Sequence, residues 1–197
     1  MIPAIDPTTK ERELNSLYGI GVIATMAFVT MTFGALIVVF MLRSQVSFNW
    51  THILLPPLLW IDTALLIASS VCFEVGHRKL RRNDQHGFYL WTRYTTTLGV
   101  FFLVGQLVAW GQIIDSGQLV RSNPHSSFFF LFSGLHGVHI LAGLAALGVL
   151  LYRTYEPASG PKWQMKTRAL ANAVGIFWHY LDVLWVVLFS LLLLVRR

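Results

Sequence analysis

Two short polar patterns interrupt the long apolar runs of this 197-residue sequence. His136 and His139 are three residues apart, and so are His179 and Asp182, so each pair shares one face if its run is helical. Imidazoles can ligate a metal or a haem, but such sites usually take ligands from several segments, with a carboxylate or thiolate among them. Because His179 is the only histidine on another apolar run, we expect His136 and His139 to form hydrogen bonds between helices instead.

The second pair allows two interpretations. Asp182 could tune His179 for proton transfer, or the two side chains could satisfy each other's hydrogen bonds within the hydrocarbon. No series of carboxylates leads away from the pair, which favours the mutual hydrogen bond. Replacing Asp182 by Leu would then leave His179 unpartnered and weaken retention of the chain by about 1 kcal/mol or more. Trp178 and Trp185, seven residues apart, share a face of the same predicted helix.

Three other polar residues lie in or beside the apolar runs. Asp62 lies about midway along a predicted helix, and Gln106 lies in the next one. Polar groups at membrane depth are costly and face a bundle interior or a partner, so we expect both to make structural contacts between helices. Glu74 has Arg78 four residues on and His77 three residues on, which predicts an ion pair on the helix surface.

The elements that carry these residues are predicted from composition and run length. Apolar residues make up 55% of the chain and charged residues 12%, about half the charged fraction of a soluble domain. A helix crosses the bilayer core in about 20 residues, and the runs of that length cover approximately residues 17–42, 53–73, 95–114, 128–152 and 173–195. The sequence therefore predicts an all-α fold, a polytopic transmembrane bundle of five helices forming one membrane domain over 1–197. The first run is too long for a signal-peptide core and lacks a small-residue cleavage site, so we expect it to be retained.

The placement of Lys and Arg predicts the orientation. Eleven of them fall in the N-terminal tail and in the connections after the second and fourth runs: Lys10, Arg12, Arg78, Lys79, Arg81, Arg82, Arg93, Arg153, Lys162, Lys166 and Arg168. Only four fall on the opposite side: Arg43, Arg121, Arg196 and Arg197. The positive-inside rule places the N-terminus in the cytoplasm and the C-terminus outside.

The basic run Arg78, Lys79, Arg81 and Arg82 is expected to contact anionic lipid headgroups. No aromatic or base-reading groups are interleaved with these cations, which argues against nucleic-acid binding. Cys72 is the only cysteine, so the chain has no intrachain disulfide and no thiolate cluster.

Two motifs resemble a known family. Residues 126–143 read Ser-Ser-Phe-Phe-Phe-Leu-Phe-Ser-Gly-Leu-His-Gly-Val-His-Ile-Leu-Ala-Gly, and residues 178–185 read Trp-His-Tyr-Leu-Asp-Val-Leu-Trp. They resemble the Ser-Phe-Phe, Thr-Gly-x-His-Gly-x-His and Trp-His-Phe-Val-Asp-Val-Val-Trp patterns of the subunit III family of cytochrome c and quinol oxidases. Supporting matches are Leu98-Gly99 with Phe102 and Gln106, and Leu55-Pro56 with Thr63, Leu65-Leu66 and Ser69-Ser70.

The resemblance implies the shortened, five-helix bacterial form of this subunit, in the plasma membrane. Such a chain has no catalytic centre, haem or copper of its own; these cofactors are expected on the catalytic subunit I, with subunit II in the same complex. It would stabilise subunit I, hold phospholipid between its helices and support proton uptake coupled to oxygen reduction in aerobic respiration. The whole assembly would be a proton-translocating cytochrome c or quinol oxidase.

Several residues depart from the family pattern. Ala27 lies near the position of a common glutamate in the first helix, and Ala109 and Asn172 replace two further familiar acids. Asp62, conversely, stands where asparagine is usual. A proton-related role for a first-helix glutamate is therefore not carried over to this chain.

Two alternatives remain at this stage. One is an accessory subunit of a nitric oxide reductase, which would share the fold but not the assembly. The other is an independent membrane transporter with Asp62, His136, His139 and Asp182 as a polar path. The sequence shows no internal repeat of the kind common in secondary transporters, which argues against the transporter.

Overall fold

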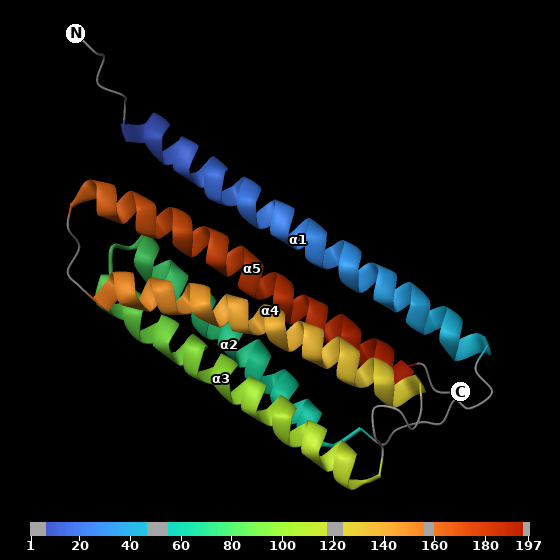
Figure 1. Ribbon diagram of the computed structural model, residues 1–197. Helices are drawn as coiled ribbons and strands as arrows, with labels where there is room; N and C mark the ends of the chain where they lie inside the picture. The colour runs from blue at the N-terminus through green and yellow to red at the C-terminus, as the bar shows by residue number, and fades with distance from the viewer. Residues whose placement is uncertain (1–6, 47–54, 118–123, 156–159, 195–197) are drawn as a thin grey trace.

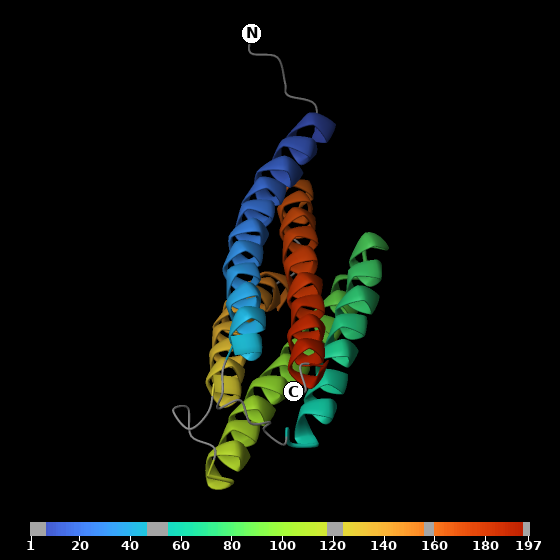
Figure 2. The ribbon, with the colours of Figure 1, turned by 90° about the vertical axis from the view of Figure 1, so that its right-hand side faces the viewer.

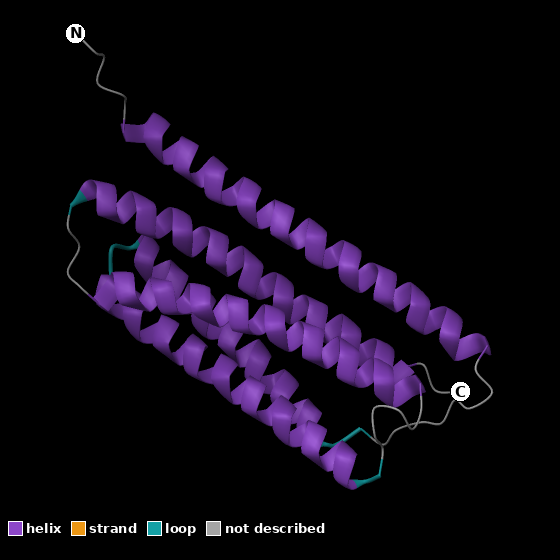
Figure 3. Cartoon of the chain, in the orientation of Figure 1, coloured by secondary structure: helices purple, strands orange, loops and turns teal. Residues whose placement is uncertain are grey.

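The computed structural model describes residues 7–46, 55–117, 124–155 and 160–194. They form five helices in chain order (Figures 1 and 3): α1 Pro7–Val46, α2 Leu58–Arg81, α3 Gln85–Asp115, α4 Pro124–Tyr155 and α5 Pro161–Leu194. All five are long and apolar enough to cross a membrane, and no strand occurs in these residues. The predicted all-α bundle of five transmembrane helices is confirmed.

Most helices are longer than the apolar runs that predicted them. α2 is the exception at its start, because it begins at Leu58 rather than near Ile53. Pro56 and Pro57 explain this shift, since a proline disfavours helical backbone in the residue before it and is itself accepted at a helix start. α2 then continues through the basic run to Arg81, because polar side chains end an apolar run without ending a helix.

α2 and α3 form a close antiparallel hairpin with a short turn at one end. Asn83 in this turn has φ 63°, a left-handed conformation that asparagine tolerates better than most residues. The Asp84 side chain then accepts a hydrogen bond from the Gly87 N–H at 2.8 Å and caps the start of α3. Its carboxylate also lies 3.3 Å from Lys79 Nζ at the end of α2.

α5 occupies the centre of the bundle and packs against α1, α2 and α4, whereas α3 packs against α2 and α4. α1 lies along the α4 and α5 side (Figure 2). The end where α2 and α4 finish and α3 and α5 begin is called the basic end here. Among described side chains it carries Arg78, Lys79, Arg81, Arg82, Arg93, Arg153, Lys166 and Arg168, against Arg43 at the other end. Lys10, Arg12, Lys162, Arg121, Arg196 and Arg197 lie outside the described side chains.

Candidate functional site

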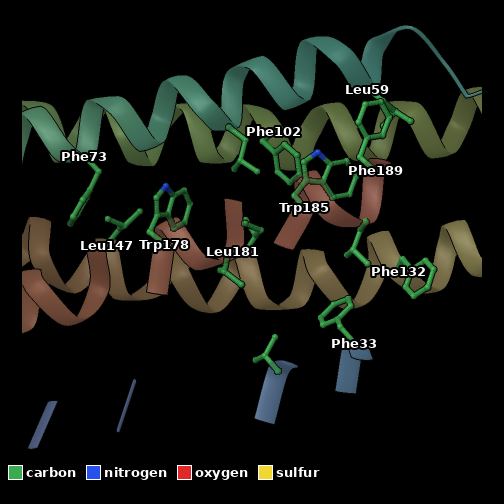
Figure 4. Packing of buried hydrophobic residues seen from close by; sticks show 14 of the residues in the cluster. Phe33, Leu59, Phe73, Phe102, Phe132, Leu147, Trp178, Leu181, Trp185 and Phe189 are labelled. Carbon is green, nitrogen blue, oxygen red and sulfur yellow. The ribbon is translucent and has the colours of Figure 1, made fainter. Parts of the chain in front are cut away.

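The two predicted tryptophans of α5 form the centre of the buried core. Trp178 and Trp185 are fully buried and lie on one face of α5, toward α2 and α3 (Figure 4). Phe102 of α3 meets Trp185 edge to face at a centroid distance of 5.2 Å. Gly99 and Gly143 lie against the Trp178 ring, where an added Cβ would come within 2.8 Å and 3.0 Å of it. The absence of side chains at these glycines leaves room for the Trp178 ring against the backbones of α3 and α4.

Both tryptophans donate hydrogen bonds to hydroxyls of α2. Trp178 Nε1 donates to Ser69 Oγ and Trp185 Nε1 donates to Thr63 Oγ1, each at 3.1 Å. Each hydroxyl in turn donates to a backbone carbonyl of its own helix, at 2.7 Å and 2.8 Å. A hydroxyl that accepts an indole N–H while donating to its own backbone leaves no polar hydrogen unsatisfied in the hydrocarbon. These bonds join α5 to α2 at two levels.

The same arrangement recurs between α3 and α4, at residues that the sequence did not single out as a pair. Trp110 Nε1 donates to Ser133 Oγ at 2.9 Å, and Ser133 Oγ donates to the Phe129 carbonyl at 2.6 Å. The sequence signal for all three tryptophan–hydroxyl hydrogen bonds is a tryptophan on one apolar run and a serine or threonine on another. Without knowing which faces meet, that signal does not specify the pairing.

Asp62 and Gln106 form a buried polar contact between α2 and α3. Gln106 Nε2 donates to Asp62 Oδ2 at 3.0 Å, and only 1% of Asp62 is exposed. Gly105 makes room for the carboxylate, because a Cβ at this position would overlap the Asp62 side chain. The predicted position of Asp62 midway along its helix was wrong: it lies near the start of α2, because α2 begins at Leu58 and extends to Arg81.

Within the described residues, the expected hydrogen bonds from His136 and His139 to other helices are not formed. His139 Nδ1 donates to the Leu135 carbonyl of its own helix at 2.7 Å, and its ring packs against Phe33 of α1. His136 is fully buried, stacks on Trp185 at 5.2 Å and has no hydrogen-bond partner among the described residues. The i, i+3 spacing aligned the two rings on α4, but an aromatic core faces His136 and offers it no polar partner.

The expected pair of His179 and Asp182 is also not formed. His179 Nδ1 instead shares a short hydrogen bond with Ser70 Oγ of α2. Asp182 is 6% exposed, and neither of its carboxylate oxygens has a hydrogen-bond partner among the described residues. Side chains three residues apart on a helix share a face, but both point away from the helix axis. A side chain of a neighbouring helix can therefore be a better-placed hydrogen-bond partner than the other member of the pair.

The basic end contains several polar contacts of its own. Arg78 Nε donates to Glu74 Oε1 at 2.9 Å, which confirms the predicted surface ion pair. His77 Nε2 donates to Asn172 Oδ1 of α5 at 2.7 Å.

Two of the four cations predicted to contact lipid therefore have acidic partners: Arg78 pairs with Glu74 and Lys79 with Asp84. Arg81 and Arg82 are exposed and make no salt bridge within the described residues. The Gly87 N–H and the Lys79 ammonium both stabilise the Asp84 carboxylate, so they lower the pKa of Asp84 below its ordinary value.

Two hollows flank α1. One, of about 470 Å³, lies between α1, α2 and α5 near the basic end, and its lining includes Glu74, His77, Arg81, Asn172 and His179. The other, of about 400 Å³, lies between α1, α4 and α5. Its lining is apolar apart from Tyr18 and Thr25. Within the described parts of the chain, no three His, Cys, Asp or Glu side chains are grouped so that they could hold a metal ion.

Comparison with known proteins identifies the family. A family model described as "Cytochrome c oxidase subunit III" matches residues 22–195. The chain belongs to the cytochrome c oxidase subunit III family. As such it is a polytopic membrane subunit of a haem-copper oxidase, which places it in aerobic respiratory electron transport.

Curated relatives of this subunit III chain include several bacterial proteins. The "Cytochrome c oxidase subunit 3" of Corynebacterium diphtheriae is 35% identical over 138 residues, which cover 70% of this chain and 65% of that protein, just under two thirds. The "Probable cytochrome c oxidase subunit 3" of Mycobacterium tuberculosis strain H37Rv is 30% identical over 200 residues, covering 96% and 94%. The subunit of Thermostichus vulcanus is 26% identical over 184 residues, covering 90% and 87%.

Proposed function

We propose that this chain is the redox-inactive subunit III of a bacterial haem-copper oxidase, bound to the catalytic subunit I in a complex that also contains subunit II. The observation that carries the proposal is the family match over residues 22–195, which includes the buried tryptophan motif of α5. The exposed apolar surface of the helices supports it, since a membrane subunit must cover such faces with lipid or with a partner.

The charge distribution supports a cytoplasmic basic end in a bacterial plasma membrane. Eight described cations gather at that end, against Arg43 at the other. Because cytoplasmic loops are enriched in Lys and Arg, the N-terminus lies in the cytoplasm and the C-terminus outside. A cysteine introduced by Arg82→Cys should react with a membrane-impermeant thiol reagent only in inverted vesicles, and Asp115→Cys only from outside. Both variants are made in a Cys72→Ala background, and the reverse labelling would contradict the orientation.

The hollows beside α1 support phospholipid binding. The apolar hollow can hold acyl chains, while Arg81 at the rim of the polar hollow can attract an anionic headgroup. Arg81 and Arg82 are the cations of the basic run without acidic partners among the described residues. We expect Arg81→Gln with Arg82→Gln to lower the anionic phospholipid that co-purifies with the complex, measured by mass spectrometry. Arg43→Gln removes a cation at the other end and is the matched control; equal losses would contradict a specific site.

The deciding experiment is affinity purification of the tagged chain in mild detergent, followed by a haem spectrum and mass spectrometry. The expected result is recovery of a haem-copper oxidase catalytic subunit with haem absorbance. Recovery of a nitric oxide reductase catalytic subunit would overturn the oxidase assignment. Recovery of the chain alone and colourless would overturn any subunit role and favour an independent transporter.

Support of proton uptake is part of the proposed role. The chain provides titratable side chains at the basic end, including Glu74, His77 and His179 around the polar hollow. Ala27 lies near the position where the family commonly has a glutamate in the first helix, and the titratable groups that line the polar hollow come from α2 and α5. Removal of the chain from the complex should slow proton uptake during turnover, measured with a pH-sensitive dye.

A further inference from the structure

The polar hollow is a path from the basic end into the bundle. Its polar lining consists of Glu74, His77 and Arg81 from α2 and of Asn172 and His179 from α5. Among the described side chains of α1, Gly19 lines this hollow, and it carries no charge and no side chain to block the space. The hollow therefore brings titratable groups of two helices into contact with water or headgroups at that end.

His179 connects the hollow to the interior. The residue lines the hollow, while its Nδ1 is bonded to the Ser70 hydroxyl of α2. The ring is half-buried, and its other nitrogen, Nε2, is not among the buried atoms that lack a hydrogen-bond partner in the described residues. An imidazole with one nitrogen toward an aqueous space and the other on a hydroxyl can accept a proton on one side and release a proton on the other.

Asp182 lies one helical turn further in. Both carboxylate oxygens are buried and unpartnered within the described residues, although the Ser70 hydroxyl lies beside the carboxylate outside hydrogen-bond geometry. The other buried Asp, Asp62, faces Gln106 of α3 and does not line the hollow. A carboxylate without a partner is costly in hydrocarbon, whereas a carboxyl group that binds a proton is neutral.

We propose that Asp182 is a proton-binding site that is loaded from the polar hollow through His179 and Ser70. A proton from water in the hollow binds His179 Nε2, and the Nδ1 proton passes to Ser70 Oγ. The Ser70 hydroxyl proton passes to the Asp182 carboxylate after rotation of the hydroxyl. One positive charge moves inward and no electrons are exchanged. Asp182 gains a proton and Ser70 is again a hydroxyl, whereas His179 is left with its proton on Nε2 and must release that proton to the hollow and regain one on Nδ1, or rotate its ring, before a second transfer. The proposal rests on the proposed function only for the side of the membrane that supplies the proton.

The test is infrared spectroscopy of the purified complex during exchange from H₂O into D₂O. A protonated carboxyl gives a C=O stretching band that shifts when its proton is replaced by deuterium. Asp182→Asn should remove one such band, and Ser70→Ala should slow its exchange by about tenfold or more, since one relay hydrogen bond is lost. Ser70→Ala is nearly isosteric, so it keeps the helix packing that a larger change at His179 would disturb.

The second buried aspartate provides the control. Asp62→Asn should leave the Asp182 band and its exchange rate unchanged, because Asp62 is bonded to Gln106 and lies outside the hollow. The proposal is overturned if Asp182→Asn removes no carboxyl band between neutral and mildly acidic pH. It is also overturned if the band exchanges as fast in Ser70→Ala as in the unchanged chain. Neither outcome depends on which catalytic subunit co-purifies, so failure here is distinct from failure of the proposed function.

Discussion

α1 and α5 pass side by side through the bundle and have similarly apolar sequences, but they are packed very differently. In the most apolar window of α5, 44% of the residues are buried within the chain, against 11% in α1. α5 is enclosed by α1, α2 and α4, whereas α1 rests on one side of the bundle (Figures 1 and 2). Apolar composition therefore identifies a membrane helix without showing whether it faces protein or lipid.

The aromatic and polar side chains of α5 explain why it is more deeply buried than α1. α5 presents Trp178, His179, Asp182 and Trp185, and three of these four form hydrogen bonds with α2 among the described residues. In hydrocarbon the aliphatic face of a helix gains little by leaving lipid, so tight packing and interhelical hydrogen bonds determine which helices associate. α1 attaches mainly through a few buried residues such as Phe33, and exposes a broad apolar face.

The largest effect should come from removing a central side chain of α5. We expect Trp178→Ala to lower the free energy of unfolding by about 3 kcal/mol, because it leaves a cavity and an unpaired Ser69 lone pair. This is the lower end of the range in soluble proteins, because lipid already solvates apolar groups. Phe28→Ala on α1 is the matched control, since Phe28 is 68% exposed, and its effect should stay within about 0.5 kcal/mol. Denaturant unfolding in detergent measures both; equal effects would refute the contrast.

Glycine substitutions test the same contrast by adding volume. At Gly99 an added Cβ would lie 2.8 Å from Trp178, whereas at Gly34 of α1 nothing lies within 4 Å. Gly99→Ala should therefore destabilise the chain by about 1 to 3 kcal/mol. Gly34→Ala should be neutral or stabilise it by up to about 1 kcal/mol through helix propensity. A stabilising Gly99→Ala would show that the Trp178 ring is packed less closely against α3 than described.

The helices and the central motif were predictable from the sequence, because bilayer thickness sets helix length and the Trp-His-x-x-Asp pattern is unusual in apolar sequence. The partner of His179 was not predictable. Spacing along one helix identifies Asp182 as its neighbour, but Ser70 lies 109 positions away in the chain and is brought to it only by packing of α2 on α5. The same limit explains His136, whose surroundings are set by rings of α3 and α5.

The position of Asp62 along its helix was mispredicted for a local reason. The apolar run was taken to start before Pro56, although the two prolines delay the helix to Leu58, and it was taken to end where charges begin. Thr63 and Ser69, whose hydroxyls accept the tryptophan N–H groups, stood out in the sequence only as matches to the family pattern. Their role as acceptors became visible only when the facing helix was in place.

A smaller difference is expected between two threonines that differ in their partners. Thr63 accepts the Trp185 N–H from α5, whereas Thr25 of α1, within the described residues, donates to the Gly21 carbonyl of its own helix and to no other helix. Thr63→Val keeps the shape and removes the acceptor, which should cost about 1 kcal/mol. Thr25→Val should change the unfolding free energy by much less. If the two variants unfold alike, the tryptophan hydrogen bonds contribute no measurable stability.

The smallest effect is expected at the turn between α2 and α3, where the inner helices are joined outside the hydrocarbon. The Gly87 N–H and Lys79 lower the pKa of Asp84 from its ordinary value of 3.8, so the folded chain favours the ionised side chain. The resulting stabilisation is fully present above that ordinary value and is lost as the pH falls through the lowered pKa of the folded chain. Asp84→Ala should therefore unfold at a lower temperature than the unchanged chain near neutral pH, and the two should converge in acid. Asp84→Asn keeps a capping oxygen without the charge, so the difference in unfolding temperature between Asp84→Asn and Asp84→Ala should not shrink in acid. If the difference between Asp84→Ala and the unchanged chain stays constant from neutral to acidic pH, the carboxylate charge does not stabilise this turn.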